Sequence, residues 1–200
     1  MPLQPDLPAV RAAFTARAPT FLDPPAGVAS HAAVALILHP SASTPGGFDL
    51  LFIERAQDER DPWSGQMAFP GGRREDIDGS IDVTVVREVE EEIGARLAQP
   101  LGRLDDYDAR TGSRKWPLIV SPFVFAVESK PTVRLSAEVA SVVWIPLATL
   151  LDPTNKTQYR WTKGVENVVM PGIRHDRHVI WGMTYKILGR FVETLGEKLP

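Results

Sequence analysis

The chain has 200 residues, of which 44% are hydrophobic, and a formal net charge of −3 at pH 7. This length and composition predict one globular domain with a sizeable core. The near-balanced charge gives no reason to expect binding to nucleic acid or to a membrane surface. The absence of cysteine excludes disulfides, thiolate catalysis and cysteine-ligated zinc.

The N-terminal segment, residues 1–27, is rich in proline and alanine, and we interpret it as an arm that leads into a domain of residues 28–200. Residues 7–17 predict a short helix that begins after Asp6. The apolar residues of the arm either fold back on their own domain or cover a partner subunit, so a homodimer is one possible outcome. The sequence shows neither the apolar run of a signal peptide nor the roughly 20 apolar residues of a membrane helix, so we expect a cytoplasmic protein.

Strands are predicted next along the chain. Residues 32–39 form a continuous apolar run of strand length, which indicates a buried central strand. Residues 48–55 predict a second strand, and we expect it beside the first because consecutive strands tend to pair. A short strand is expected at residues 67–69, directly before a proline and two glycines.

A helix is predicted at residues 81–93, where apolar residues recur at steps of four. Ser80 or Asp82 is its expected N-cap, and Gly94 is its expected C-terminal stop. The remaining elements are expected strands at residues 101–110, 117–129, 139–147, 158–162 and 166–173, a short helix at 147–152 and a final helix at 178–199. This order of elements predicts an α/β fold, specifically an α/β/α sandwich with a mixed sheet.

The helix at residues 81–93 carries a cluster of carboxylates. Glu88, Glu91 and Glu92 stand at positions i, i+3 and i+4, so they project from one side of the helix. Their mutual repulsion costs roughly 0.2–0.5 kcal/mol per pair, and the helix dipole disfavours anions near the C-terminal end. A divalent cation would reverse both penalties, and Mg²⁺ or Mn²⁺ takes carboxylate oxygens and also binds phosphates. The alternative is a solvated helix face, but the glycine turn just before the helix favours a metal–phosphate site.

The stretch from Gly72 to residue 95 resembles the Nudix box, whose usual form is G-x5-E-x7-R-E-U-x-E-E-x-G-U with U aliphatic. The half "REVEEEIGA", which starts at Arg87, matches this pattern throughout. Asp78 stands where the family usually has Glu, and one extra residue separates it from Arg87. The resemblance implies the fold of Nudix hydrolases, which hydrolyse the pyrophosphate of nucleoside diphosphate derivatives with the help of divalent metals.

The resemblance also implies roles for individual residues. Glu88, Glu91 and Glu92 would hold Mg²⁺ or Mn²⁺, and one of these glutamates would take the proton of the attacking water. Arg87 would orient a carboxylate through a charge-assisted hydrogen bond. Glu138, in the loop before a predicted strand, is either a further metal-binding or basic glutamate or a plain exposed side chain.

The segment upstream of the box resembles that of coenzyme A pyrophosphatases, and the similarity covers most of residues 30–195. It implies hydrolysis of coenzyme A or acyl-CoA to adenosine 3′,5′-bisphosphate and (acyl-)phosphopantetheine. The alternatives are a Nudix pyrophosphatase acting on ADP-ribose, a dinucleotide or a nucleoside triphosphate, or a non-catalytic Nudix-fold binding module. In each of the alternatives in which the protein is an enzyme, its binding partner is a small nucleotide substrate. The positions with implied substrate-binding roles are Arg55, Arg60, Gln66, Phe69, Gly71 and Gly72.

The same segment departs from the subfamily pattern in two places. Glu54 stands in the region where the subfamily usually has a threonine. The stretch "DPWSG" stands where the subfamily has a shorter loop that contains histidine. Arg55 and Arg60 suit phosphate geometrically, although ordinary surface pairing is the alternative. Trp63 is an addition that either stacks on a base or packs against the protein.

Overall fold

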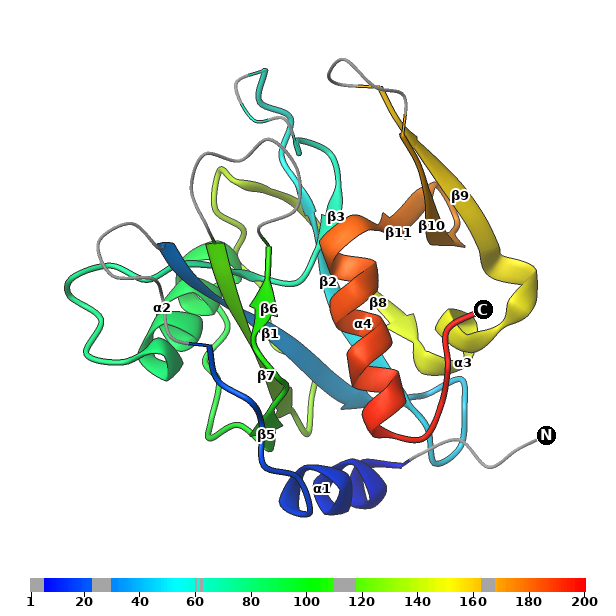
Figure 1. The fold of residues 1–200 in the computed structure, drawn as a ribbon, viewed down its shortest axis with the longest axis horizontal. Helices are drawn as coiled ribbons and strands as arrows, with labels where there is room; N and C mark the ends of the chain where they lie inside the picture. The colour runs from blue at the N-terminus through cyan, green and yellow to red at the C-terminus, as the bar shows by residue number, and fades with distance from the viewer. Residues whose placement is uncertain (1–5, 23–29, 60, 62, 110–117, 163–167) are drawn as a thin grey trace.

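The computed structural model describes residues 6–22, 30–59, 61, 63–109, 118–162 and 168–200. Figure 1 shows a twisted central sheet with helix α2 (Ile81–Ile93) on one side and helix α4 (Gly182–Thr194) on the other. A second, smaller sheet lies beside α4. This arrangement confirms the prediction of an α/β fold with a mixed sheet.

Strand β1 organises the main sheet. It runs parallel to β7 and antiparallel to β2 and β4. The expected pairing of the first two strands is confirmed by the contact of Leu38 with Leu50. The strands of this sheet are β1 (Ser30–Pro40), β2 (Phe48–Arg55), β3 (Met67–Ala68), β4 (Gly71–Arg73), β5 (Gly102–Arg103), β6 (Tyr107–Asp108), β7 (Leu118–Ala126) and β8 (Val139–Pro146).

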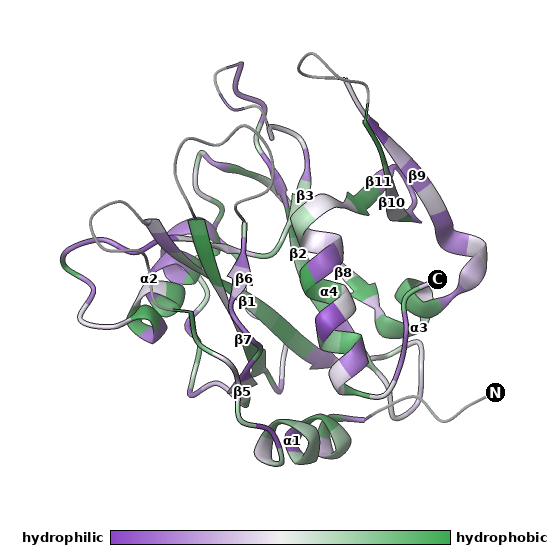
Figure 2. Cartoon of the chain, viewed as in Figure 1, coloured by the Kyte–Doolittle hydropathy of each residue, from purple (hydrophilic) through white to green (hydrophobic). Residues whose placement is uncertain are grey.

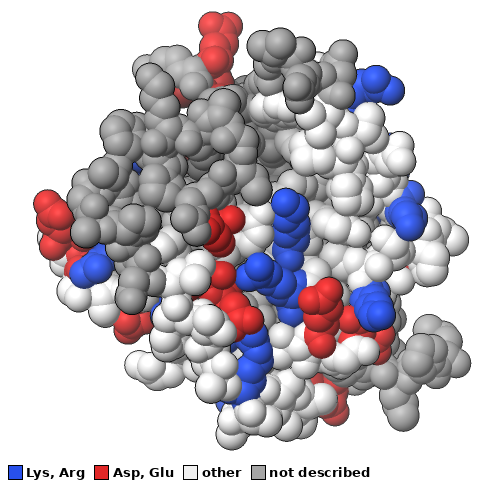
Figure 3. Space-filling model, in the orientation of Figure 1, with Lys and Arg blue, Asp and Glu red and all other residues white. Residues whose placement is uncertain are grey.

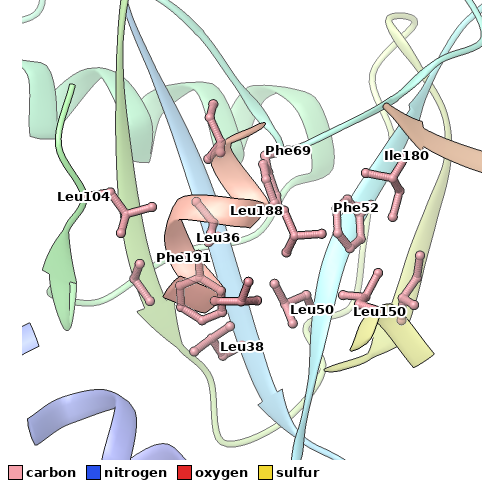
Figure 4. Packing of buried hydrophobic residues seen from close by; sticks show 14 of the residues in the cluster. Leu36, Leu38, Leu50, Phe52, Phe69, Leu104, Leu150, Ile180, Leu188 and Phe191 are labelled. Carbon is pink, nitrogen blue, oxygen red and sulfur yellow. The ribbon is translucent and has the colours of Figure 1, made fainter. Parts of the chain in front are cut away.

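The core lies on both faces of this sheet, because successive side chains of a strand point to opposite faces. Leu36 and Leu38 of β1 belong to a cluster that includes Phe191 of α4, whereas Ala35 and Ile37 belong to the cluster under α2. Figure 4 shows the first cluster, and Figure 2 shows β1 and β7 as apolar strands. A strand covered on both faces needs apolar residues at nearly every position, as the run at residues 32–39 predicted.

Helix α1 (Leu7–Thr15) confirms the short helix expected in the N-terminal segment. The Asp6 carboxylate caps it by accepting a hydrogen bond of 2.8 Å from the backbone of Ala9. Val10 and Phe14 are buried in the main core, where the Phe14 ring lies 6.3 Å from that of Phe191. These apolar residues of the arm therefore fold back on their own domain.

Two of the expected elements differ in the structure. Residues 101–110 were expected as one strand, but in the described residues 101–109 the structure has two short strands, β5 and β6. Between them, the Asp106 backbone donates to the carbonyl of Thr20 in the arm, which takes that backbone out of the sheet ladder. Residues 110–117, which include the segment between the strands expected at 101–110 and 117–129, lie outside the described residues.

The final helix begins four residues later than expected. Residues 178–181 form strand β11 (His178–Trp181), which pairs with β10 (Val168–His175). Gly182 then adopts a positive φ of 63°, which separates the strand from the helix. The second sheet is completed by β9 (Lys156–Trp161), which follows α3 (Leu147–Leu151) and the short 3₁₀ helix at Pro153–Asn155.

Helix α2 has the predicted bounds. Val85, Val89 and Ile93 are at most 1% exposed and form its buried stripe. Gly94 ends the helix with a left-handed φ of 69°, and Ser80 occupies the N-cap position without a side-chain cap hydrogen bond.

On the face shown in Figure 3, a line of basic side chains is flanked by acidic ones rather than spread into a wide basic surface. This mixture agrees with the near-balanced composition. Among the described residues, no helix is long and apolar enough to cross a membrane.

Candidate active site

The glycine turn brings strand β4 against both β1 and α2. Gly71 has a φ of 144°, and a Cβ there would overlap the carbonyl oxygen of Ala33 in β1. A Cβ on Gly72 would overlap the carboxyl group of Glu88 on α2. The backbone N–H of Gly71 donates a hydrogen bond of 2.8 Å to Glu92. The two glycines therefore allow the backbone to approach the carboxylates of the helix directly.

Arg87 connects the carboxylates on this side of α2. Its guanidinium donates to Glu91 at 2.8 Å and to Glu88 at 3.0 Å. It also donates to the backbone carbonyl of Arg73 in β4 at 3.0 Å. These contacts suit an orienting role for Arg87, because its planar guanidinium binds two carboxylates and a strand carbonyl at the same time.

The Asp78 carboxylate binds Arg87 and holds its side chain in position. It is 2% exposed and accepts two hydrogen bonds of 2.9 Å from Arg87. The hydroxyl of Thr84 and the backbone of Glu75 each donate to it at 2.9 Å. These donors, led by Arg87, hold the pKa of the Asp78 carboxyl well below its usual range. Both oxygens are thus committed to the protein, so Asp78 positions Arg87.

We expect Asp78→Asn to lower the melting temperature at pH 7 by about 5 °C or more, because an amide cannot accept both bonds from Arg87. Since the folded-state pKa is depressed, the contribution of Asp78 is present above its ordinary pKa of 3.8 and is lost as the pH falls below it. Thermal unfolding of both proteins between pH 7 and pH 3 measures this. The neighbouring exposed Asp76→Asn is the control, and equal melting temperatures of wild type and Asp78→Asn at pH 7 would contradict the anchoring role.

Glu92 is the most deeply buried carboxylate of the helix, with 5% exposure. Burial raises its pKa to about 7; the charges of Glu88 and Glu138 add to this rise, and the Gly71 N–H and Arg55 oppose it. Burial also raises the pKa of Glu88, assisted by Glu91 and Glu138 and opposed by Arg87. The four carboxylates therefore act on one another within one region of the molecule.

The loop before β8 places Glu138 in this region. Backbone N–H groups of Arg134 and Ser136 donate to the carbonyls of Ile93 and Glu92, at 2.8 and 2.9 Å. These bonds attach the loop to the C-terminal end of α2. The carbonyl of Glu138 in turn accepts a bond of 2.8 Å from the residue after Arg55. The sequence alone left open whether Glu138 lies near the helix carboxylates, and this tertiary contact brings it there.

The donor set suits a hard divalent cation, because Glu88 and Glu92, whose pKa values are raised mainly by burial, also feel the charge of neighbouring carboxylates. In the described part of the chain, no three Asp, Glu or His side chains converge as a ready-made metal site. Glu88 and Glu91 turn toward Arg87, and Glu92 turns toward Gly71. A cation would replace part of these contacts and relieve the repulsion, so the residues fit such an ion by their chemistry.

The expected substrate-binding residues fall into different places. Arg55 lies at the end of β2 and donates to Asp61 at 2.6 and 2.9 Å. Gln66 is half-buried and closes the loop that begins after Arg55. Phe69 is 4% exposed and stacks on Phe52 at 4.8 Å. The Phe69 side chain therefore packs in the core, and its substrate-binding role stays a prediction. Arg60 lies outside the described residues.

Sequence reasoning missed two residues of this region, Thr84 and Asp61. Thr84 is fully buried, and its hydroxyl donates to Asp78 at 2.9 Å. The signal in the sequence was its position, three residues before Arg87 and four before Glu88, which puts it on the same helix face as these two residues. Asp61 carried no local signal, because its contact with Arg55 depends on how the intervening loop closes.

Comparisons with known proteins agree with this geometry. The sequence model of the NUDIX domain matches residues 29–165. A Caenorhabditis elegans protein named peroxisomal coenzyme A diphosphatase ndx-8 is 34% identical over 133 residues, which cover 64% of this chain and 53% of that protein. An uncharacterized Nudix hydrolase of Yersinia enterocolitica, NudL, is 30% identical over 153 residues, which cover 72% of each protein. The chain spans about half the length of the worm relative, so the activity of that whole protein does not pass directly to this chain.

A solved structure shows the same fold. The NUDIX domain of Shewanella oneidensis NrtR, in complex with ADP-ribose, superposes with a TM-score of 0.51 at 19% identity. The match covers 68% of this chain and 83% of that one. Because the NUDIX model spans more than half of the sequence and the acidic helix has the predicted bounds, this chain belongs to the Nudix hydrolase family.

Proposed function

We propose that this protein is a divalent-metal-dependent pyrophosphatase that hydrolyses coenzyme A or acyl-CoA. The products are adenosine 3′,5′-bisphosphate and (acyl-)phosphopantetheine. The observation that carries the proposal is the grouping of Glu88, Glu91, Glu92 and Glu138 beside the Gly71–Gly72 turn. Coenzyme A is favoured among pyrophosphates by the resemblance around Arg55 and by the worm relative named as a coenzyme A diphosphatase.

In this proposal, Glu88, Glu91, Glu92 and Glu138 hold Mg²⁺ or Mn²⁺, which supplies positive charge to the phosphate oxygens when bound. Arg87 keeps the helix carboxylates in place, anchored by Asp78. The oxygen of a water molecule bonds to one phosphorus, and the bond from that phosphorus to the bridging oxygen breaks. One of the helix glutamates accepts the proton that the water releases.

On the substrate side, Arg55 binds the pyrophosphate. Its guanidinium presents several donors in a plane, and Asp61 occupies only the side of Nε and one terminal nitrogen. The Arg55 charge already acts on Glu92, so the arginine lies within electrostatic reach of the carboxylates. We assign the side chain of Gln66, at the end of the same loop, to substrate contact as well. The lack of side chains at Gly71 and Gly72 lets this backbone lie directly against Glu88 and Glu92, and we assign the two glycines to substrate contact as well.

The test is a metal-dependent assay of the full chain with Mg²⁺ and with Mn²⁺. The panel contains coenzyme A, acetyl-CoA, ADP-ribose, a diadenosine polyphosphate and nucleoside triphosphates, with products identified by mass spectrometry. We expect the highest kcat/KM with coenzyme A or acetyl-CoA and no turnover in EDTA. Faster turnover of ADP-ribose would reject coenzyme A as the substrate, and no turnover of any pyrophosphate would favour a binding module.

A further inference from the structure

Glu54, near the end of β2, is a largely buried carboxylate with 15% of its side chain exposed. Its Oε2 accepts a hydrogen bond of 2.8 Å from the Ser141 hydroxyl of β8 and one of 2.5 Å from the guanidinium of Arg177. Nε2 of His178, whose side chain is 11% exposed, lies 3.4 Å from the same oxygen. These four side chains form the Glu54 junction, which connects β2 to β8 and to the hairpin of β10 and β11.

The Glu54 junction differs from an ordinary surface ion pair. A pair between Glu54 and the 70% exposed Arg177 alone would contribute little, because water competes for both charges. A carboxylate that leaves water needs donors to replace its hydration, and here they come from segments 87 and 123 residues away along the chain. The coenzyme A pyrophosphatases that this segment resembles usually have a threonine in this region, and its short neutral side chain cannot form such an ion pair.

The register between β2 and β8 shifts directly beside the Glu54 junction. Glu54 pairs with Ser141 and Arg55 pairs with Val139, so one residue of β8 is inserted between the two pairs. A bulge of this kind bends the strand and re-aims the neighbouring side chains. The hydrogen bond from Ser141 holds Glu54 in place at this irregular point. It thereby restrains the backbone from which the Arg55 side chain projects.

Glu54 and Arg55 face opposite sides of the main sheet, because consecutive residues of a strand alternate. Phe52 belongs to the core cluster on the α4 side, and Ile53 belongs to the cluster under α2. Glu54 accordingly binds the hairpin on the α4 side, whereas the Arg55 charge acts on Glu92 of α2. Figure 1 shows β10 and β11 beside α4 and away from α2. The Glu54 junction therefore supports the end of β2 from the face opposite the catalytic carboxylates.

Arg55 is also restrained at its guanidinium and along its backbone. Asp61 accepts two hydrogen bonds from the guanidinium, at 2.6 and 2.9 Å. The Arg55 N–H donates to the carbonyl of Gln66, and the Arg55 carbonyl accepts from the N–H of Gly65, both at 3.0 Å. A long side chain that is ordered before a ligand arrives loses less conformational entropy on binding. These contacts prepare Arg55 for binding an anion, and Glu54 holds the strand that carries it.

We propose that Glu54 is a positioning residue for binding the pyrophosphate of the substrate. It does not touch the substrate. It holds the bulged end of β2 so that the guanidinium of Arg55 faces a diphosphate bound beside Glu92. Through Arg177 and His178, the β10–β11 hairpin thereby contributes to phosphate binding from the opposite face of the sheet. This inference rests on the proposed pyrophosphatase activity and deepens it.

The experiment is a double-mutant cycle of Glu54→Ala and Arg55→Ala with coenzyme A as the substrate. We expect Glu54→Ala to raise KM about tenfold with little change in kcat, because Arg55 loses its alignment in the ground state and the transition state alike. In the Arg55→Ala background the same substitution should have almost no effect, because the residue through which Glu54 acts is missing. Glu54→Gln keeps an acceptor oxygen and should keep a KM near that of the wild type.

Arg177→Ala is a second variant that tests the junction from the hairpin side, because a side chain with 70% exposure can be truncated without disturbing the core. It should raise KM in the same direction by about threefold. Arg174→Ala is the matched control, because Arg174 is an exposed arginine of the same hairpin and contacts Thr157 of β9 at 3.4 Å. This control variant should keep the wild-type KM and kcat.

Calorimetric titration with methylenediphosphonate in Mg²⁺ measures diphosphate binding without turnover. Glu54→Ala should weaken this binding about tenfold, and only when Arg55 is present. A similar loss in both Arg55 backgrounds, a loss of kcat with unchanged KM, or unchanged diphosphonate binding would overturn the inference. If the wild type binds the diphosphonate but cleaves no pyrophosphate, the proposed function fails, and the titration alone decides the role of Glu54.

Discussion

Glu92→Gln is expected to reduce kcat/KM about a thousandfold and, at the same time, to stabilise the metal-free protein at pH 8 by about 3 kcal/mol. The loss of activity follows from the loss of a charged ligand at the proposed metal site. The gain in stability follows from the environment of the side chain, because burial raises the pKa of Glu92 from 4.5 to about 7. A neutral amide of nearly the same shape avoids that cost and still accepts the bond from Gly71.

The effect on stability has a defined pH dependence. Between about pH 4.5 and 7 the folded protein keeps a proton on Glu92 that the unfolded chain has released, so wild-type stability falls as the pH rises through this window. The glutamine variant lacks this dependence. The two proteins should therefore differ little at pH 4 and most at pH 8.

Urea unfolding in EDTA at pH 4.5 and pH 8, together with kinetics in Mg²⁺, measures both effects. Glu90→Gln is the matched control, because Glu90 lies on the same helix, is 48% exposed in its side chain and forms a surface ion pair with Arg96. It should change neither activity nor stability by much. Near-wild-type turnover by Glu92→Gln would remove Glu92 from the proposed metal site.

Gly72→Ala is expected to reduce kcat by about a hundredfold with little change in KM. The added Cβ would overlap the carboxyl group of Glu88, so this side chain must move away from β4. A displacement of about 1 Å at a catalytic group costs activity on this scale. The affinity for Mn²⁺ should fall as well, since Glu88 is one of the proposed ligands.

Steady-state kinetics and calorimetric titration with Mn²⁺ test this expectation. Gly79→Ala is the matched control, because Gly79 follows β4 in the segment before α2 and a Cβ there meets nothing within 4 Å. That variant should behave as the wild type. If Gly72→Ala kept full kcat and Mn²⁺ affinity, the contact between the turn and Glu88 would have no part in catalysis.

Residue periodicity and local breakers predicted most of the secondary structure. Residues 32–39 and 48–55 were correctly predicted as strands because they are buried on both faces. Residues 81–93 were correctly predicted as a helix because one stripe is apolar and Gly94 ends it. The predicted start of the last helix was wrong. Residues 178–181 contain no local feature that excludes a helix, and only pairing with β10 makes them a strand.

The residues of the site also fall into two groups, those that the sequence predicted to lie together and those that only the tertiary structure brings to them. The spacing of Glu88, Glu91 and Glu92 on one helix face follows from 3.6 residues per turn, so the sequence by itself determined that these carboxylates lie together, and with the glycine turn it determined the family. Only the tertiary structure decided which other groups join them. Glu138 arrives because its loop binds the end of α2, and Arg55 joins Asp61 because the intervening loop closes. Phe69 turns into the core because Phe52 lies across from it. These outcomes depend on contacts between segments far apart along the chain or on the path of a loop, which no local pattern encodes.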